Sequence, residues 1–181
     1  STVQAMPVGG ANVSISGAVV TINPTANLDS SEAYYVQIAA TAFDDASGNS
    51  YAGISDTTSL SFTAADTVGP TMVITSTTSG VSNGVATNDS TINLTFTANE
   101  AATGFVVGDI TVTGGSLSSF ATVSSTVYTA TFTPSGAGAK TIDVAANKFT
   151  DAAGNNNSAA TQFSWTYDNV APTMAITSTT S

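Results

Sequence analysis

Hydrophobic and polar residues alternate along short stretches of this chain, and no stretch shows the longer period typical of a helix. In residues 91–97, Ile92, Leu94 and Phe96 fall on one side of an extended strand, and hydroxyl or amide side chains fall on the other. Clusters of Gly, Asn, Ser and Pro separate such stretches. The pattern predicts short strands that each bury one face in a core.

Between Pro70 and Asp168 this pattern recurs often enough to build a complete domain. The predicted strands are residues 71–76, 91–97, 109–113, 119–123, 127–133, 140–146 and 161–167. The last of them carries Phe163, Trp165 and Tyr167 on the side that we expect to be buried. Seven short strands with turns between them favour an all-β fold, an immunoglobulin (Ig)-like sandwich of about 100 residues.

Two internal repeats show how the chain is organised. The sequence DTVGPTMVITSTTS at residues 66–79 returns as DNVAPTMAITSTTS at residues 168–181. The sequence FDDASGN at residues 43–49 returns as FTDAAGN at residues 149–155. Both pairs lie about 100 residues apart, which is the size of one sandwich domain.

The residues before Asp66 match only the second half of this repeating unit. They predict strands at 18–24, 33–40 and 59–64, with Tyr34, Val36 and Ile38 facing inward, and the first two strands of the unit are absent. Residues 170–181 read as a linker and the first strand of another copy. We therefore expect tandem Ig-like sandwiches, one complete domain flanked by incomplete ones, cut from a longer array. The predicted boundaries are 1–66, 67–168 and 169–181.

Composition narrows the chemistry that such a chain can perform. The net charge is −10, His and Cys are absent, and Lys140 and Lys148 are the only basic residues. Nucleic acid is excluded as a partner because phosphate binding needs clustered basic residues. Catalysis by imidazole or thiolate is excluded as well, and we expect no enzyme activity. No apolar run is long enough to span a membrane. An acidic, Cys-free surface indicates an extracellular bacterial protein that is stabilised by cores and ions.

Several of these motifs together resemble a known family. The pattern Asp-Ala-x-Gly-Asn before a closing aromatic strand, followed by Asp-x-x-x-Pro-Thr, is similar to the tandem bacterial Ig-like repeats of large surface adhesins and S-layer-type proteins. Residues 19–62 resemble the second half of the S-layer-associated variety, and residues 70–167 resemble another variety. The resemblance implies a structural role on the bacterial cell surface, with domains that calcium often stiffens.

The strand directions predict a metal site at one end of the complete domain. If the first strand runs away from Asp66, the second returns to bring Glu100 to the same end, and the sixth returns to bring Asp151 and Asn155. Carboxylates gathered there would repel one another unless a cation lay between them. Oxygen ligands of this kind suit Ca²⁺, which would fix the angle between consecutive domains.

The same residues also permit a purely structural interpretation. Asp-Ala-Ala-Gly-Asn reads as a tight turn in which Asp and Asn bond to their own backbone and Gly supplies a positive φ. A second and weaker metal candidate is the loop that contains Asp44, Asp45 and Asn49, whose upstream linker is missing. Calcium binding and a turn held only by its own hydrogen bonds are therefore both open interpretations of these loops.

The sequence features that would indicate a glycosidase, or a surface that binds ice or polysaccharide, are less specific. Asp44 and Asp45 are adjacent, so their side chains diverge and do not form a glycosidase pair. The spacing of Thr129, Thr131 and Thr133 would make a hydroxyl array for ice or a polysaccharide, although Thr is also common on the solvent face of any strand. A carbohydrate- or ice-binding module is therefore a third alternative.

Two hypotheses of function lead. In the first, the chain is a spacer in a long surface protein, and its partners are neighbouring Ig-like domains of the same chain. In the second, residues 173–179 fill the gap left by missing strands in an adjacent copy. Such an exchange joins different surfaces of successive copies, so it would propagate as a homo-polymeric filament.

Overall fold

The computed structural model describes residues 4–179 and is nearly all β-structure. Its contacts divide the chain into two compact units, a first unit of Ser1–Thr67 and a second unit of Val68–Ser181. The one helix among the described residues is a single 3₁₀ turn, Val107–Asp109. The all-β prediction is therefore confirmed.

The first unit contains two separate hairpin-like sheets. Its strands are β1 (Val13–Ser16), β2 (Val19–Ile22), β3 (Ala33–Tyr35) and β4 (Ser61–Thr63). β1 pairs antiparallel with β2, and β3 pairs antiparallel with β4. The rings of Tyr34 and Phe62 stack across the second pair, with their centroids 6.0 Å apart. Strand β1 was not predicted, and the other three are shorter than the alternation suggested.

No residue between 4 and 67 is buried in this unit. Tyr34, Val36 and Ile38, predicted to face a core, alternate with exposed neighbours but are only half-buried. The predicted alternation is right, but the predicted burial of these three side chains is wrong. Two two-stranded sheets offer no opposing layer thick enough to cover the side chains. Val19 remains 63% exposed, so the first unit keeps much of its apolar surface in contact with solvent.

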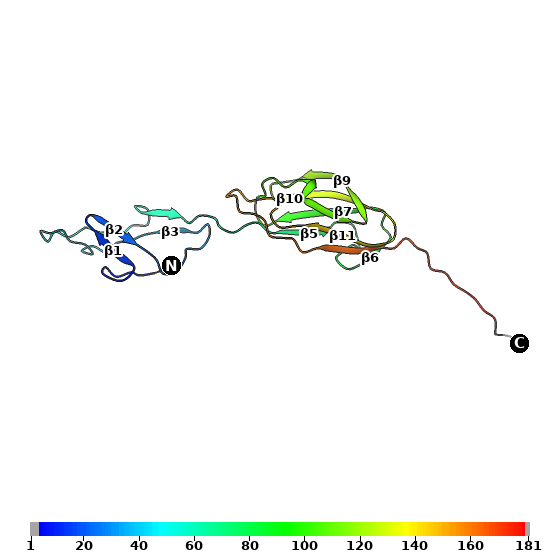
Figure 1. Cartoon of the computed structure of the whole chain (residues 1–181), viewed down its shortest axis with the longest axis horizontal. Helices are drawn as coiled ribbons and strands as arrows, with labels where there is room; N and C mark the ends of the chain where they lie inside the picture. The colour runs from blue at the N-terminus through cyan, green and yellow to red at the C-terminus, as the bar shows by residue number, and fades with distance from the viewer. Residues whose placement is uncertain (1–3, 180–181) are drawn as a thin grey trace. The chain divides into compact units, whose positions relative to one another are not determined.

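The second unit is a sandwich of two four-stranded sheets (Figure 1). In strand order, the first sheet is β5 (Met72–Ser76), β7 (Ile92–Ala98), β10 (Val127–Pro134) and β9 (Gly115–Thr122). The second is β6 (Ala86–Thr87), β12 (Phe163–Tyr167), β11 (Gly138–Val144) and β8 (Ile110–Thr113). All neighbours are antiparallel except β6 and β12, which are parallel.

Alternate residues of the central strands fill the space between the two sheets. In β7, Ile92, Leu94 and Phe96 are buried and the residues between them are mostly exposed. The opposing β11 buries Ile142 and Val144 in the same way. The period of two in the sequence thus places one face of each strand in a shared core, as sandwich packing requires.

Aromatic rings dominate that core. Phe105 lies among four other rings, with centroids between 5.0 and 6.0 Å away; they belong to Phe96, Phe120, Tyr128 and Phe149. Trp165 meets Phe132 edge to face across the two sheets, at 4.9 Å. Edge-to-face pairs of this kind add stability beyond the area that they bury.

Strand β6 was not predicted, and two further features of the second unit differ from the sequence prediction. β9 begins at Gly115, whereas a strand was expected only from residue 119. Gly115 fits inside the sheet because a Cβ there would lie 2.4 Å from the carbonyl oxygen of Thr133, a place that only glycine can occupy. Tyr167, expected in the core, is half-buried because β12 ends at that residue.

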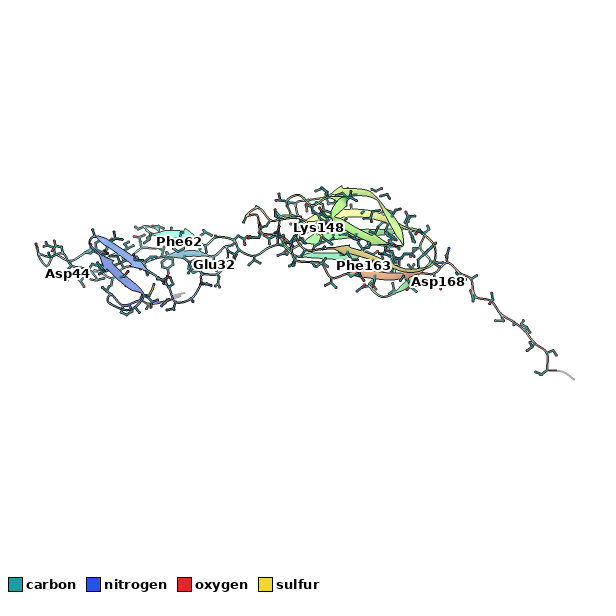
Figure 2. All side chains as sticks on the ribbon, in the orientation of Figure 1. Glu32, Asp44, Phe62, Lys148, Phe163 and Asp168 are labelled. Atoms are coloured by element: carbon teal, nitrogen blue, oxygen red, sulfur yellow. The ribbon has the colours of Figure 1, made fainter. Side chains whose placement is uncertain are left out.

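The described residues after β12, 168–179, form no secondary structure, and all of them are exposed. Asp168 marks the point where the chain leaves the sandwich (Figure 2). The strand predicted at 173–179 is therefore not formed here, because a β-strand needs a paired neighbour to satisfy its backbone. Met174 and Ile176 are 87% and 89% exposed.

We expect Gly69→Ala to destabilise the second unit by about 1–3 kcal/mol, the usual cost of overpacking. The added Cβ would lie 1.9 Å from the carbonyl oxygen of Asn156, so the backbone must shift. Urea unfolding followed by fluorescence of Trp165, the only tryptophan, measures the loss. Gly108→Ala is the control, because no atom lies within 4 Å of its added Cβ. Equal losses in the two variants would contradict this account of the packing.

Candidate metal site

The first strand of the sandwich is tied to the loop that carries Glu100. The side-chain oxygen of Asn99 accepts a hydrogen bond from the backbone N–H of Thr71 at 2.6 Å, and Asn99 N–H donates to the Thr71 carbonyl at 3.2 Å. Asn99 directly follows β7, so this pair continues the ladder between β5 and β7. The bonds hold the neighbouring Glu100 at the end of the sandwich where β5 begins.

A second loop reaches the same end from β11, and Asn157 shapes it. The side chain of Asn157 is buried and makes four hydrogen bonds. Its oxygen accepts from the N–H groups of Lys148 and Phe149 at 2.7 and 3.0 Å, and its nitrogen donates to the carbonyls of Ala145 and Ser158 at 2.9 and 2.7 Å. One amide thus fixes the backbone on both sides of residues 149–157. Sequence reasoning missed this residue, whose only signal is a run of three asparagines.

Backbone bonds join the two loops to each other and to the incoming chain. Thr103 and Thr150 exchange two hydrogen bonds, at 2.7 and 3.1 Å. The carbonyl of Pro70 accepts from the N–H of Ser158 at 3.0 Å. As a result, one carboxylate oxygen each of Asp66, Glu100 and Asp151 lies within 4.8 Å of the others. The structure therefore brings together the three carboxylates that strand direction placed at one end.

Asn155, the fourth predicted ligand, holds Asp151 in place. Its backbone N–H donates to Asp151 Oδ1 and its amide nitrogen donates to Oδ2, both at 2.8 Å. Burial alone would raise the pKa of Asp151, which is 3% exposed. The bonds from Asn155, with those from the N–H groups of Gly154 and Ala153, outweigh burial and lower that pKa. Asp151 is therefore an anion at neutral pH, with its oxygens fixed.

Asp66 lies on the segment that leads into β5. Its Oδ1 accepts a hydrogen bond from the Ser30 hydroxyl at 2.8 Å, and the same hydroxyl accepts from the N–H of Thr67 at 2.9 Å. Asp66 and Glu100 are half-buried, whereas Asp151 is buried. The cluster therefore offers oxygen ligands of graded exposure, a set that suits a hard cation.

The weaker candidate loop repeats the turn of Asp151 without its neighbours. Asp45 accepts from the backbone N–H and the amide nitrogen of Asn49, again at 2.8 Å each. Asp44 bonds instead to the hydroxyl of Ser50 at 2.5 Å. Among residues 4–179, neither aspartate belongs to a group of three close carboxylates. Hydrogen bonds within the turn thus account for this loop, and metal binding there stays an untested prediction.

The threonines considered for a flat binding surface lie on the outer face of the first sheet. Thr129 pairs with Thr95, which in turn pairs with Thr75. Thr129 and Thr131 are half-buried and Thr133 is exposed. Their positions are those of an ordinary solvent-facing side of a sandwich, and binding of ice or carbohydrate stays a prediction.

Two family models match the chain, and both are described as a bacterial Ig-like domain. One matches residues 66–167 and the other matches residues 1–64. The chain belongs to the bacterial Ig-like domain family. We call the two matches the second and the first domain; the second domain begins at Asp66 and so includes the whole carboxylate cluster. No curated protein and no solved structure gave a significant match.

Family membership confirms the resemblance and the tandem arrangement. Bacterial Ig-like domains are generally non-catalytic structural modules that occur on surface or extracellular proteins. Within residues 4–179, no helix has the length and apolar character needed to cross a membrane.

Asn49→Ala is expected to raise the pKa of Asp45 toward the ordinary value of about 3.9. The side-chain amide of Asn49, followed by its backbone N–H, holds that pKa below its usual range. Because folding lowers this pKa, the turn stabilises the first domain fully above about pH 4 and loses the effect as the pH falls through the folded value.

Carbon-13 NMR titration of the carboxyl groups measures this change directly. Asn155→Ala is the matched control, since it removes the same side-chain hydrogen bond from Asp151 and leaves Asp45 unchanged. A pKa of Asp45 that does not move in Asn49→Ala would show that the turn does not hold the carboxylate.

Proposed function

We propose that this chain is a structural spacer from a bacterial surface protein, such as an adhesin stalk or an S-layer component, and that it works outside the cell. The observation that carries the proposal is the path of the chain through the second domain. The chain enters β5 beside Ser158, ahead of β12, and leaves after Tyr167, at the other end of β12 (Figure 1). Each such domain adds its full length to an array.

The same path suits a domain that transmits tension. Its first strand, β5, and its last, β12, lie in different sheets and are held by β7 and β11 respectively. A pull on the two ends runs along the strands, so the five paired positions of β5 and β7 must break together rather than one by one. The edge-to-face contact between the rings of Phe132 and Trp165 resists sliding of one sheet over the other.

Single-molecule pulling on the whole chain tests this role. We expect one dominant rupture that releases about 30 nm, the extended length of about 96 residues less the folded length. Ile74→Ala, which empties a buried position of β5, should lower the rupture force, whereas Val73→Thr on the exposed face should leave it unchanged. Release of this length without a distinct rupture would contradict a spacer under tension.

We further propose that Asp66, Glu100 and Asp151 bind Ca²⁺, with Asn155 orienting Asp151. Three carboxylate oxygens within 4.8 Å of one another would supply three of the six to eight oxygens that the ion takes, and carbonyls or water would supply the rest. The ion would relieve repulsion among three anions, one of them buried and kept ionised by its turn. It would also fasten the segment entering the second domain to two of that domain's loops.

Calcium should therefore raise the melting temperature of the second domain. Fluorescence of Trp165 measures this temperature. At a hundredfold excess over the dissociation constant, we expect a rise of about 10 °C that a chelator reverses. Glu100→Gln should abolish the rise. Asp45→Asn alters the corresponding turn of the first domain, away from the cluster, and should retain the rise. No rise in the unaltered chain, or an equal rise in Glu100→Gln, would refute the site.

A further inference from the structure

The carboxylate of Asp66 is held by a hydroxyl from the first domain. Ser30 Oγ donates a hydrogen bond to Asp66 Oδ1 at 2.8 Å, and the two residues lie 36 positions apart in the sequence. The same oxygen accepts a hydrogen bond from the backbone N–H of Thr67 at 2.9 Å. A hydroxyl has one proton to donate. Since Ser30 Oγ is the acceptor for Thr67, its own proton goes to the carboxylate.

Other contacts of the first domain fix the position of Ser30. It lies in the turn of residues 29–32, where the N–H of residue 32 donates to the carbonyl of Asp29 at 3.4 Å. The next residue, Ser31, has a φ of 60°, which a residue other than glycine adopts only where surrounding contacts hold it. The backbone N–H of Asp29 also donates to the hydroxyl of Tyr34 at 2.8 Å, and that ring stacks across β3 and β4. The turn is thus tied to the two paired strands.

The bond from Ser30 orients Asp66 without cancelling its charge. A hydroxyl is a neutral donor, and a hydrogen bond to a carboxylate favours the ionised form. Asn155 holds Asp151 in the same manner, through its amide and its backbone N–H. Two of the three carboxylates in the cluster are therefore oriented by neutral donors. This is the kind of support that fixes the ligands of a metal site.

Asp66 has particular need of such support. It lies between β4 and β5, in a segment without secondary structure, whereas Asp151 is buried in its turn. Fixing one rotamer of a side chain on such a segment costs conformational entropy when a ligand binds. Because the Ser30 hydroxyl already holds the carboxylate, less entropy is lost when the ion arrives.

We propose that Ser30 is a positioning residue of the calcium site, and that Ca²⁺ bound by Asp66, Glu100 and Asp151 in turn stabilises the turn of residues 29–32. The inference rests on the proposed calcium site and goes beyond it, because the affinity for the ion then depends on a turn of the first domain. The dependence is reciprocal: the factor that the Ser30 bond adds to the affinity for the ion is the factor that the ion adds to the stability of this bond. Ca²⁺ thus couples the stabilities of the two domains.

Calcium titration calorimetry on the whole chain tests the role of Ser30, and the heat that Glu100→Gln removes identifies binding at this site. Ser30→Ala should weaken that binding by about tenfold, as the loss of a group that orients a metal ligand usually does. Ser30→Thr keeps a hydroxyl and should restore the affinity to within about twofold. Ser59→Ala is the matched control, because its hydroxyl bonds to Asp56 in the first domain, outside the cluster.

A second variant tests the same contact without removing Ser30, should Ser30→Ala fail to fold. Tyr34→Phe removes the hydroxyl that accepts from Asp29 but keeps the ring that stacks on Phe62. We expect a loss of calcium affinity that is smaller than in Ser30→Ala, because the turn is loosened while the Ser30 hydroxyl remains.

Amide hydrogen exchange separates this coupling from a purely structural role of Ser30. In the unaltered chain, saturating Ca²⁺ should slow exchange of the Asp29 and Thr67 amides by at least about threefold. The amide of Ser59, which bonds to Asp56, should not change. The slowing should vanish in Ser30→Ala. A serine that only stabilised the turn would change exchange of these amides equally with and without Ca²⁺.

The results that overturn the inference are distinct from those that refute the site. Absence of any calcium heat that depends on Glu100 refutes the site, and this inference with it. Equal affinity in the unaltered chain, Ser30→Ala and Tyr34→Phe leaves the site intact and overturns the role of Ser30. Slowing of Asp29 exchange that persists in Ser30→Ala overturns the coupling through this hydroxyl.

Discussion

Burial of alternate side chains between two four-stranded sheets is the interaction on which the rest of this structure depends. Phe96, Phe132 and Ile142 are fully buried, and the ring of Trp165 joins the two sheets. The loops that carry Glu100 and Asp151 leave the ends of strands fixed by that core. Hydrogen bonds of Asn99, Thr103 and Asn157 then hold these loops in place. The separation of chain entry from chain exit follows from the sandwich itself.

The two domains of the chain use related sequences with very different outcomes. Both contain an Asp-x-x-Gly-Asn turn with the same hydrogen bonds, at Asp45 and at Asp151. Only the second domain has opposing sheets, and its residues form a buried core. In the first domain, no residue between 4 and 67 is buried. The turn therefore forms from local hydrogen bonds in both domains. Burial of a core, in contrast, requires a second sheet opposite the first. A carboxylate cluster arises only where a turn meets other elements of a complete sandwich.

Alternation of polar and apolar residues was sufficient to predict β7, β10 and β11, because each of these strands has one buried face. Strand direction alone predicted that Glu100 and Asp151 would meet. Sequence could not reveal β6, whose two residues show no period, or Asn157, whose four bonds depend on tertiary contacts. The strand expected after Asp168 has the right pattern, but residues 168–179 form no secondary structure in this chain. Strand formation depends on pairing as well as on pattern, and no local pattern shows the pairing.

The central claim is that the stability of the chain resides in the sandwich of the second domain. Amide hydrogen exchange of the native chain, resolved by residue, tests it most directly. The account predicts that the amides of Phe96, Ala130 and Ile142 exchange only on global unfolding, about a thousandfold or more slower than those of Val20 and Tyr34. Equal protection in the strands of both domains would contradict it.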